Sequence, residues 1–372
     1  MKTIPLSAVV LAAGRSSRMG RPKALLPIGG RTVLEHVVSV FHDNGLSDIQ
    51  VVTGHGRSEL APVLRASGAR IVENPRFNEG MFSSVLAGLD AVDGACAGVF
   101  IMPVDIPLVR PESIGRLREA CRADPNALIV PTFQARPGHP PLIPAAMIPQ
   151  VAAWREPGGL RAFIRASASR TIRVEVPDVH ILLDLDTPED YRHLTRRWAH
   201  RHIPTPEECE VILRSVHPTS EAVIRHGHAV ARIADAMVSA LAESGEALDG
   251  KLIHAAAVLH DVAKGQPSHA ETGGAWLKAL GFEEVGRVVA SHSNPALRET
   301  GDVTSAEVLY LADKFVSGEK VVSLFERFHN ARMRFGGHTG AENGIRRRED
   351  TAHRIRDRIE SRIRQPIENI LP

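Results

Sequence analysis

The sequence has few cysteines: Cys96, Cys121 and Cys209 are the only three in 372 residues, and no two of them have CxxC spacing. This scarcity excludes a disulfide framework and argues against a cysteine-ligated zinc or iron-sulfur site. No run reaches the ~18 apolar residues of a membrane span, and the start shows no signal-peptide pattern. The net charge is only +2, which gives no electrostatic footprint for nucleic acid or an anionic membrane. We therefore expect a cytoplasmic protein without nucleic-acid or membrane partners.

The first half of the chain has the pattern of an α/β domain. A length of 372 residues predicts two or three domains at a prior of about 150 residues each, and we take two as the working number. Up to about residue 195, amphipathic stretches alternate with short apolar runs at 8–11, 49–52, 70–72, 98–101, 127–130 and 179–183. This rhythm predicts a Rossmann-like, mostly parallel sheet covered by helices, over residues 1–198. In such sheets ligands bind beyond the carboxyl ends of the strands.

The second half has a helical pattern instead. After a polar, proline-bearing segment at 200–206, helices are predicted at 206–214, 220–241, 249–260, 269–280, 304–315 and 350–367. Residues 205–372 are therefore predicted to form an all-α domain.

The loop after the first predicted strand, Leu11 to Lys23, carries glycine and basic residues. Gly14 would let the chain turn sharply and bring backbone N–H groups close to an anion, and Arg18 and Lys23 would supply cations. Taken alone, such a loop is more often an ordinary strand-to-helix connection than a triphosphate site.

Acidic residues follow two of the predicted strands. Asp105 comes after the fourth, and Leu183–Asp190 closes the last strand and opens a helix. A turn or helix cap would be an ordinary role for each, with Thr187 or Asp186 as N-cap and Pro188 in the first helical turn. Two strand-end carboxylates beside a basic loop are also what holding a magnesium-bound triphosphate requires.

Several motifs of the first half follow one another in the order that is typical of one enzyme family. They are LAAGRSSRMGRPK, Val51–Gly54, Asn74–Pro75, Gly80 with Ser83–Val85, PVDIP, Pro137–Pro141 and LLDLDTPED. Over residues 6 to about 195, this series resembles the molybdenum cofactor cytidylyltransferase family of the MobA-like nucleotidyltransferase fold. The related guanylyltransferases usually have LAGG rather than LAAG, and the Gly-His-Pro segment at 138–140 is not typical of them, which favours CTP over GTP.

The resemblance implies a role for each matching position. Nucleotide and phosphates would bind Ala12, Ala13, Gly14, Arg18 and Lys23, and Mg²⁺ would bind Asp105 and Asp186. Arg18, Lys23 and Asp105 would serve catalysis. Contacts to the nucleotide or pterin would come from Thr53, Ser83, Ser84, Gly138, His139 and Pro140. The implied substrates are CTP and molybdopterin, with molybdoenzyme apoproteins or their chaperones as candidate partners, and transfer to another phosphorylated acceptor remains the alternative.

Histidines and aspartates lie on several predicted helices of the second half. His226 falls on an apolar stripe, His260 and Asp261 are adjacent in an apolar helix, and Asp313 lies in another. Singly, each is more often a satisfied core histidine or a surface acid. Together they form a suitable nitrogen and oxygen ligand set for Mn²⁺, Fe or Zn²⁺, and His269 and His292 have positions suited to a second metal.

The order H, HD, H, H, D, with LHDVAK and LYLADK, resembles the HD-domain phosphohydrolases over residues 215 to about 330. The resemblance implies a water activated by metal for attack on a phosphoester, with Lys264 near the anion. The substrate is left open by the sequence. The alternative is a regulatory module that binds metal and nucleotide without turnover.

Overall fold

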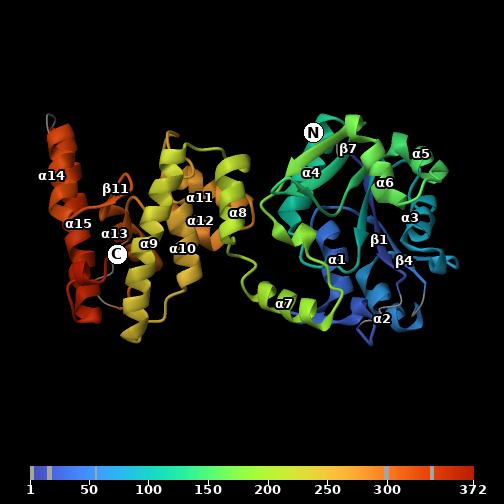
Figure 1. Ribbon diagram of the computed structural model, residues 1–372, viewed down its shortest axis with the longest axis horizontal. Helices are drawn as coiled ribbons and strands as arrows, with labels where there is room; N and C mark the ends of the chain where they lie inside the picture. Colours follow the sequence, from blue (N-terminus) through green and yellow to red (C-terminus); the bar gives the residue numbers. More distant parts are fainter. Residues whose placement is uncertain (1–3, 15–18, 55–56, 297–300, 336–338) are drawn as a thin grey trace. The chain divides into compact units, whose positions relative to one another are not determined.

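The computed structural model describes residues 4–14, 19–54, 57–296, 301–335 and 339–372. The chain divides into two compact units, Met1–Arg201 and His202–Pro372. The first contains a mostly parallel sheet and the second is helical, which confirms the predicted fold class (Figure 1). The functional domain limits, 1–198 and 205–372, stay predictions.

The first unit is built on one mixed sheet with the strand order β10-β7-β9-β6-β1-β4-β5, and β8 pairs with β7. Neighbouring strands are parallel except at β9 and β8, which run antiparallel to their partners. The strands are β1 Leu6–Ala12, β4 Asp48–Thr53, β5 Arg70–Glu73, β6 Gly98–Pro103, β7 Leu128–Phe133, β8 Arg136–Pro137, β9 Leu142–Pro144 and β10 Thr171–Glu175. A small hairpin pairs β2 Pro27–Ile28 with β3 Arg31–Thr32.

Helices cover both faces of this sheet, as βαβ connections require. They are α1 Val33–His42, α2 Arg57–Ser67, α3 Met81–Asp90, α4 Pro111–Ala123, α5 Ile148–Ala153, α6 Gly159–Ala166 and α7 Pro188–Ala199. Successive residues of a strand point to opposite faces. Val9 and Ile101 therefore pack in one core with α3, α5 and α6, while Phe100 contacts Phe41 of α1 with ring centroids 5.5 Å apart.

Five short 3₁₀ segments connect these elements: η1 Lys23–Leu25, η2 Phe77–Glu79, η3 Ala145–Met147, η4 Ala168–Arg170 and η5 Val179–Leu182. The prediction of a strand at 179–183 is wrong, because this segment is η5. The buried Asp178 carboxylate accepts the backbone N–H of His180 and so caps a tight turn. The last strand of this sheet in the sequence is β10, which begins eight residues before the predicted run and pairs with β7.

The second unit is a bundle of helices. They are α8 Pro206–Val211, the π-helix η6 Ile212–Val216, α9 Glu221–Glu243, α10 Gly250–Leu259, α11 His269–Ala279, α12 Glu283–Ser291, α13 Ser305–Lys314, α14 Leu324–Phe335, α15 Thr339–Ile363 and the 3₁₀ turn η7 Ile367–Asn369. Two were not predicted, α12 and α14, and α15 begins earlier than the predicted residue 350. One antiparallel hairpin, β11 Val316–Ser317 with β12 Lys320–Val321, makes the all-helical description incomplete.

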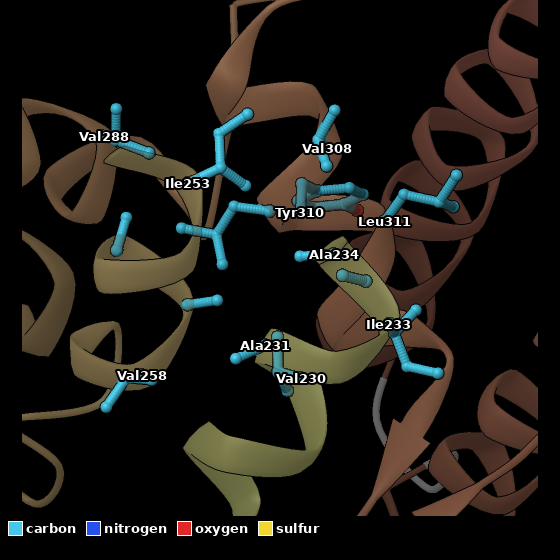
Figure 2. Close-up of a cluster of buried hydrophobic side chains, with 14 of the residues drawn as sticks. Val230, Ala231, Ile233, Ala234, Ile253, Val258, Val288, Val308, Tyr310 and Leu311 are labelled. Atoms are coloured by element: carbon cyan, nitrogen blue, oxygen red, sulfur yellow. The ribbon is translucent and has the colours of Figure 1, made fainter. Parts of the chain in front are cut away.

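The core of this bundle lies between α9, α10, α12 and α13. Figure 2 shows side chains of these helices, among them Val230, Ile253, Val288 and Tyr310, pointing toward one another. Their helical spacing places the residues before and after each apolar position on other faces of the helix, and those faces can carry polar groups. Among the described helices, none combines the length and apolar character needed to cross a membrane.

Candidate functional sites

The first candidate site begins where β1 ends. Ala12 and Ala13 are buried, and Gly14 is exposed. Gly14 is not among the glycines with positive φ, and a Cβ added there would meet no atom within 4 Å. The residues that follow Gly14 are outside the described part of the chain, so the sharp turn expected at this position stays a prediction. Arg18 lies outside the described residues.

Asp105, Asp186 and Lys23 meet although they are far apart in the sequence. The Lys23 Nζ lies 3.4 Å from Asp105 Oδ2 and also donates to Asp186 Oδ1. The side chains of Lys23, Asp105 and Asp186 are 14%, 24% and 42% exposed, respectively. The group therefore lies near the surface, where a ligand could reach it.

Backbone hydrogen bonds hold the two acidic segments together. Val104 N–H donates to the carbonyl oxygen of Leu11, which ties the end of β6 to the end of β1, and Leu185 N–H donates to that of Asp105. Asp186 then precedes α7, whose first turn is closed by a capping box between Thr187 and Asp190. The N-cap proposed for this segment is therefore Thr187, which leaves the Asp186 carboxylate for Lys23.

The carboxylates around Lys23 favour the binding of a divalent cation. Burial raises the pKa of Asp105 above its ordinary value, against the opposing charge of Lys23 and with a further rise from Asp186. Burial also raises the pKa of Asp184, and the charges of Asp105 and Asp186 add to this rise. Three carboxylates thus lie around Lys23. Carboxylate oxygens are the ligands that Mg²⁺ prefers, so this donor set fits magnesium.

Three hydroxyl residues implied as ligand contacts instead have internal partners. Thr53 Oγ1 donates to the carbonyl of Val72 over 3.3 Å, and the Asn74 amide donates to the hydroxyls of Ser83 and Ser84 over 2.9 Å each. All three hydroxyl side chains are buried. They position the segment around Asn74, and their direct contact with a ligand stays a prediction.

The segment Gly138–Pro140 packs against the chain just before the acidic cluster. His139 N–H donates to the carbonyl of Ile181 over 3.0 Å, and a Cβ added at Gly138 would lie 2.6 Å from that oxygen. Burial lowers the pKa of His139 to about 4, so its ring is neutral at pH 7. Its Nδ1 is buried without a hydrogen-bond partner among the described residues, which leaves a polar atom for a ligand.

The second candidate site is a cavity of about 420 Å³ in the helical unit. Each of the six predicted metal-ligand residues lines it, and most are at helix ends: His226 on α9, His260 and Asp261 after α10, His269 at the start of α11, His292 after α12 and Asp313 near the end of α13. Lys264 lines it too, with Nζ 2.9 Å from Asp261 Oδ2.

Three of these histidines have their Nδ1 atoms held by backbone carbonyls. His226 Nδ1 pairs with Gly318 over 2.8 Å, His260 Nδ1 with Ala257 over 2.8 Å, and His292 Nδ1 with Val289 over 2.7 Å. A donor at Nδ1 places the free lone pair on Nε2, which is the arrangement that orients imidazoles toward a metal.

The Nε2 atoms converge on Asp261 and Asp313. Asp261 Oδ2 lies 3.6 Å from His260 Nε2, while Asp261 Oδ1 lies 3.4 Å from that of His269 and 3.9 Å from that of His292. Two groups of three could each hold a metal ion, and Asp261 belongs to both: His226, His260 and Asp261, and Asp261, His269 and His292.

Burial and charge tune these groups for metal binding. Burial lowers the pKa of His260, and it lowers the pKa of His292 to about 4. Burial by itself would raise the pKa of Asp313, but the Lys314 ammonium and His226 outweigh it and hold the pKa well below its usual value. Neutral imidazoles and ionised carboxylates are the forms that bind metals, so the donor set fits a transition metal.

Other histidines of the helical unit pair elsewhere. His228 Nε2 lies 2.9 Å from Glu210, and His254 Nδ1 lies 2.9 Å from Asp235. Sequence reasoning missed the three other charged residues of the cavity, Lys314, Arg327 and Arg348. Lys314 follows Asp313 in the LYLADK motif and could have been found there. The two arginines come from α14 and α15, and no spacing rule connects them with the histidines.

Comparisons with known proteins support the predicted family of each half of the chain. Residues 8–172 match the model of the MobA-like NTP transferase domain, and residues 223–318 match that of the HD domain. Nicotine blue oxidoreductase from Paenarthrobacter nicotinovorans is 32% identical over 197 residues, which cover 51% of this chain and 96% of the relative. Molybdenum cofactor cytidylyltransferase from Escherichia coli is 28% identical over 198 residues, covering 52% and 97%.

A third relative matches a shorter region. Bifunctional protein GlmU from Sorangium cellulosum is 39% identical over 124 residues, which cover 31% of this chain and 26% of the relative. The chain thus spans about a quarter of the length of that relative. The predicted family is confirmed by the two half-chain relatives and by the domain matches, and the chain belongs to the MobA-like NTP transferase family and carries an HD domain in its second half.

Proposed function

We propose that the first unit is a magnesium-dependent nucleotidyltransferase that moves CMP from CTP to the terminal phosphate of molybdopterin. The observation that carries this proposal is the meeting of Asp105 and Asp186 at Lys23 beside the end of β1. Magnesium held by the two carboxylates would supply charge neutralisation for the triphosphate.

The charge of the acceptor phosphate explains why the reaction needs no residue beyond these. A phosphomonoester is largely ionised near neutral pH, so its oxygen can attack the α-phosphorus of CTP without a general base. The reaction then needs alignment and neutralisation of two approaching anions. Lys23 would leave the carboxylates for the phosphates when the metal binds, and Arg18 would add a second cation. Pyrophosphate leaves as CMP joins the acceptor.

The choice of CTP and molybdopterin rests on the LAAG and Gly-His-Pro segments and on the Escherichia coli relative named for that reaction. Two other candidates compete: transfer to another phosphorylated acceptor, and the oxidoreductase activity in the name of the Paenarthrobacter relative. The paired carboxylates beside Lys23 favour phosphate chemistry over a redox reaction.

The experiment is to supply the full chain with Mg²⁺, molybdopterin and either CTP or GTP, and to identify the products by mass spectrometry. A cytosine dinucleotide of the pterin, formed with one pyrophosphate or two orthophosphates per dinucleotide, supports the proposal. Transfer to a sugar phosphate in place of the pterin would establish the alternative acceptor, and reduction of a dye without nucleotide release would establish the redox alternative.

We also propose that the helical unit is a metal-dependent phosphohydrolase. Asp261 between two groups of histidines carries this proposal, with Lys264 next to it. Metals bound there would supply Lewis acidity and an activated water. The test is phosphate release by the full chain with Mn²⁺ from a panel of phosphoesters. A regulatory module would bind the metal and release no product from any of them.

A further inference from the structure

We propose that the cavity of the helical unit binds inorganic pyrophosphate and hydrolyses it to two orthophosphates. This inference rests on the proposed phosphohydrolase function and names its substrate. It follows from the side chains that line the cavity beyond the metal-ligand residues.

The lining has an excess of positive charge before any metal is added. Four cationic side chains, of Lys264, Lys314, Arg327 and Arg348, face the carboxylates of Asp261 and Asp313, which leaves two positive charges in excess. Two divalent ions would increase this excess further. A cavity of this kind favours an occupant with several negative charges in a small volume over a singly charged phosphodiester.

The four cationic side chains differ in the contacts that they already make within the protein. Lys264 and Lys314 pair with Asp261 and Asp313, and Arg327 donates to the carbonyl of Val316 over 2.9 Å. Within the part of the chain that the structure describes, the Arg348 guanidinium has no hydrogen bond or ion pair with another side chain or carbonyl. An arginine at the rim is suited to bind a phosphate group with two parallel hydrogen bonds.

Apart from the histidines of the metal groups and the arginines, the described lining of the cavity has few features that recognise a nucleobase. Of the described residues that line it, none is Phe, Tyr or Trp, and none carries a side-chain amide. Bases are commonly held by stacking on such rings and by amide hydrogen bonds to their edges. The lining thus provides contacts for phosphate oxygens and few for a base or a sugar, which favours pyrophosphate over a nucleotide.

The hydrolysis balances without a further reactant. A water oxygen attacks one phosphorus, and the bond from that phosphorus to the bridging oxygen breaks. The bridging oxygen keeps the electron pair and leaves as part of the second orthophosphate, and the proton from water passes to solvent or to that phosphate. Nucleotidyl transfer from a nucleoside triphosphate releases pyrophosphate, so the reaction proposed for the first unit belongs to the class that supplies this substrate. Removal of the product would make that transfer irreversible.

The first test is binding without turnover. Imidodiphosphate, which has a P–N–P link, is titrated calorimetrically into the metal-free full chain. Removal of one arginine contact to phosphate weakens binding about tenfold, so Arg348→Met should raise the Kd by that factor. Arg346→Met is the matched control, because Arg346 is exposed on the same helix and does not line the cavity. Equal binding by all three proteins would overturn the assignment of Arg348.

The second test separates this inference from the proposed function. The full chain with Mn²⁺ is assayed for phosphate release from pyrophosphate, CMP and CDP, and for release of 4-nitrophenolate from bis(4-nitrophenyl) phosphate. Faster release from pyrophosphate than from the others supports the inference. Hydrolysis of nucleotides or the diester without hydrolysis of pyrophosphate would overturn the inference while the phosphohydrolase function stands. No release from any substrate by metal-loaded protein would overturn both.

Discussion

The backbone N–H of Leu185 donates a hydrogen bond to the carbonyl oxygen of Asp105 over 2.8 Å. This bond joins the segment after β6 to the segment before α7, and it brings Asp186 toward Asp105. Leu185 is fully buried, so the contact is part of the core. The meeting of the two carboxylates is therefore set by the backbone, and their side chains can be changed without loss of the fold.

Replacement of Lys23 by glutamine should separate its competition with a metal ion from its contribution to CMP transfer. The ammonium lies between Asp105 and Asp186 and competes with a metal ion for them. Without it, Mg²⁺ should bind more tightly to the nucleotide-free protein, because the carboxylates lose their existing cation. Transfer should fall about 100-fold, the usual effect of removing one group that stabilises the charge of a transition state.

The Lys23→Gln result is read from two measurements, Mg²⁺ titration calorimetry and kcat for CMP transfer. Arg122→Gln is the control, because Arg122 is exposed on α4. A variant with weaker magnesium binding would show that Lys23 supports the metal and does not compete with it.

The two histidine groups predict different metal contents for two variants. Asp261 belongs to both groups, so Asp261→Asn should lose both ions. His292→Asn should keep one, because His226, His260 and Asp261 form their group without it. Metal per chain is measured by mass spectrometry after dialysis against Mn²⁺. His254→Asn should match the wild type, since His254 pairs with Asp235 outside the cavity. Full loss from His292→Asn would mean that the ions bind as one unit.

The buried ion pair of Asp178 predicts how stability changes in acid. Burial would raise the pKa of Asp178, but Arg110 at 2.9 Å and the hydrogen bond of His180 lower it well below its usual value. A depressed folded pKa means that the ionised carboxylate stabilises the fold above about pH 4 and that this stability is lost as the pH falls below that value.

Asp178→Asn should therefore lower the free energy of unfolding by about 3–5 kcal/mol at pH 7, because it removes the buried charge that pairs with Arg110. The difference from wild type should shrink as the pH falls below about 4. Urea unfolding at a series of pH values measures this, with Asp124→Asn on the exposed end of α4 as control. A difference that grows in acid would contradict the assigned direction.

A close contact between α11 and α12 predicts that replacing its glycine by alanine destabilises the second unit. Gly274 of α11 lies against Gly286 of α12, where an added Cβ would come within 2.5 Å of the Gly286 carbonyl oxygen. Gly274→Ala should destabilise by about 1–3 kcal/mol through overpacking. Gly340→Ala is the matched control, because no atom lies within 4 Å of its added Cβ and alanine favours a helix. Thermal unfolding compares them, and equal Tm values would show that the two helices can separate at little cost.

Local patterns predicted much of the fold, while several site contacts depend on distant parts of the chain. The apolar runs at 8–11, 49–52 and 98–101 became β1, β4 and β6, because strand character depends on neighbouring residues. The run at 179–183 was misread, since the side chain of Asp178 turned an apolar segment into a 3₁₀ helix.

For the sites, histidine and aspartate order predicted the residues but not their orientation. The Nδ1 bonds of His260 and His292 to carbonyls three residues earlier direct Nε2 into the cavity, and spacing alone does not encode them. The contact of Lys23 with Asp186 and the placing of Arg348 at the cavity also depend on the tertiary fold.

The most direct test of the central claim is CMP transfer to molybdopterin by Asp105→Asn. The account predicts that transfer falls by at least about 1,000-fold, since the metal loses a carboxylate ligand, while the unfolding curve stays that of the wild type. Asp90→Asn, on the exposed end of α3, should keep full activity. Undiminished transfer by a folded Asp105→Asn protein would contradict the assignment of this site.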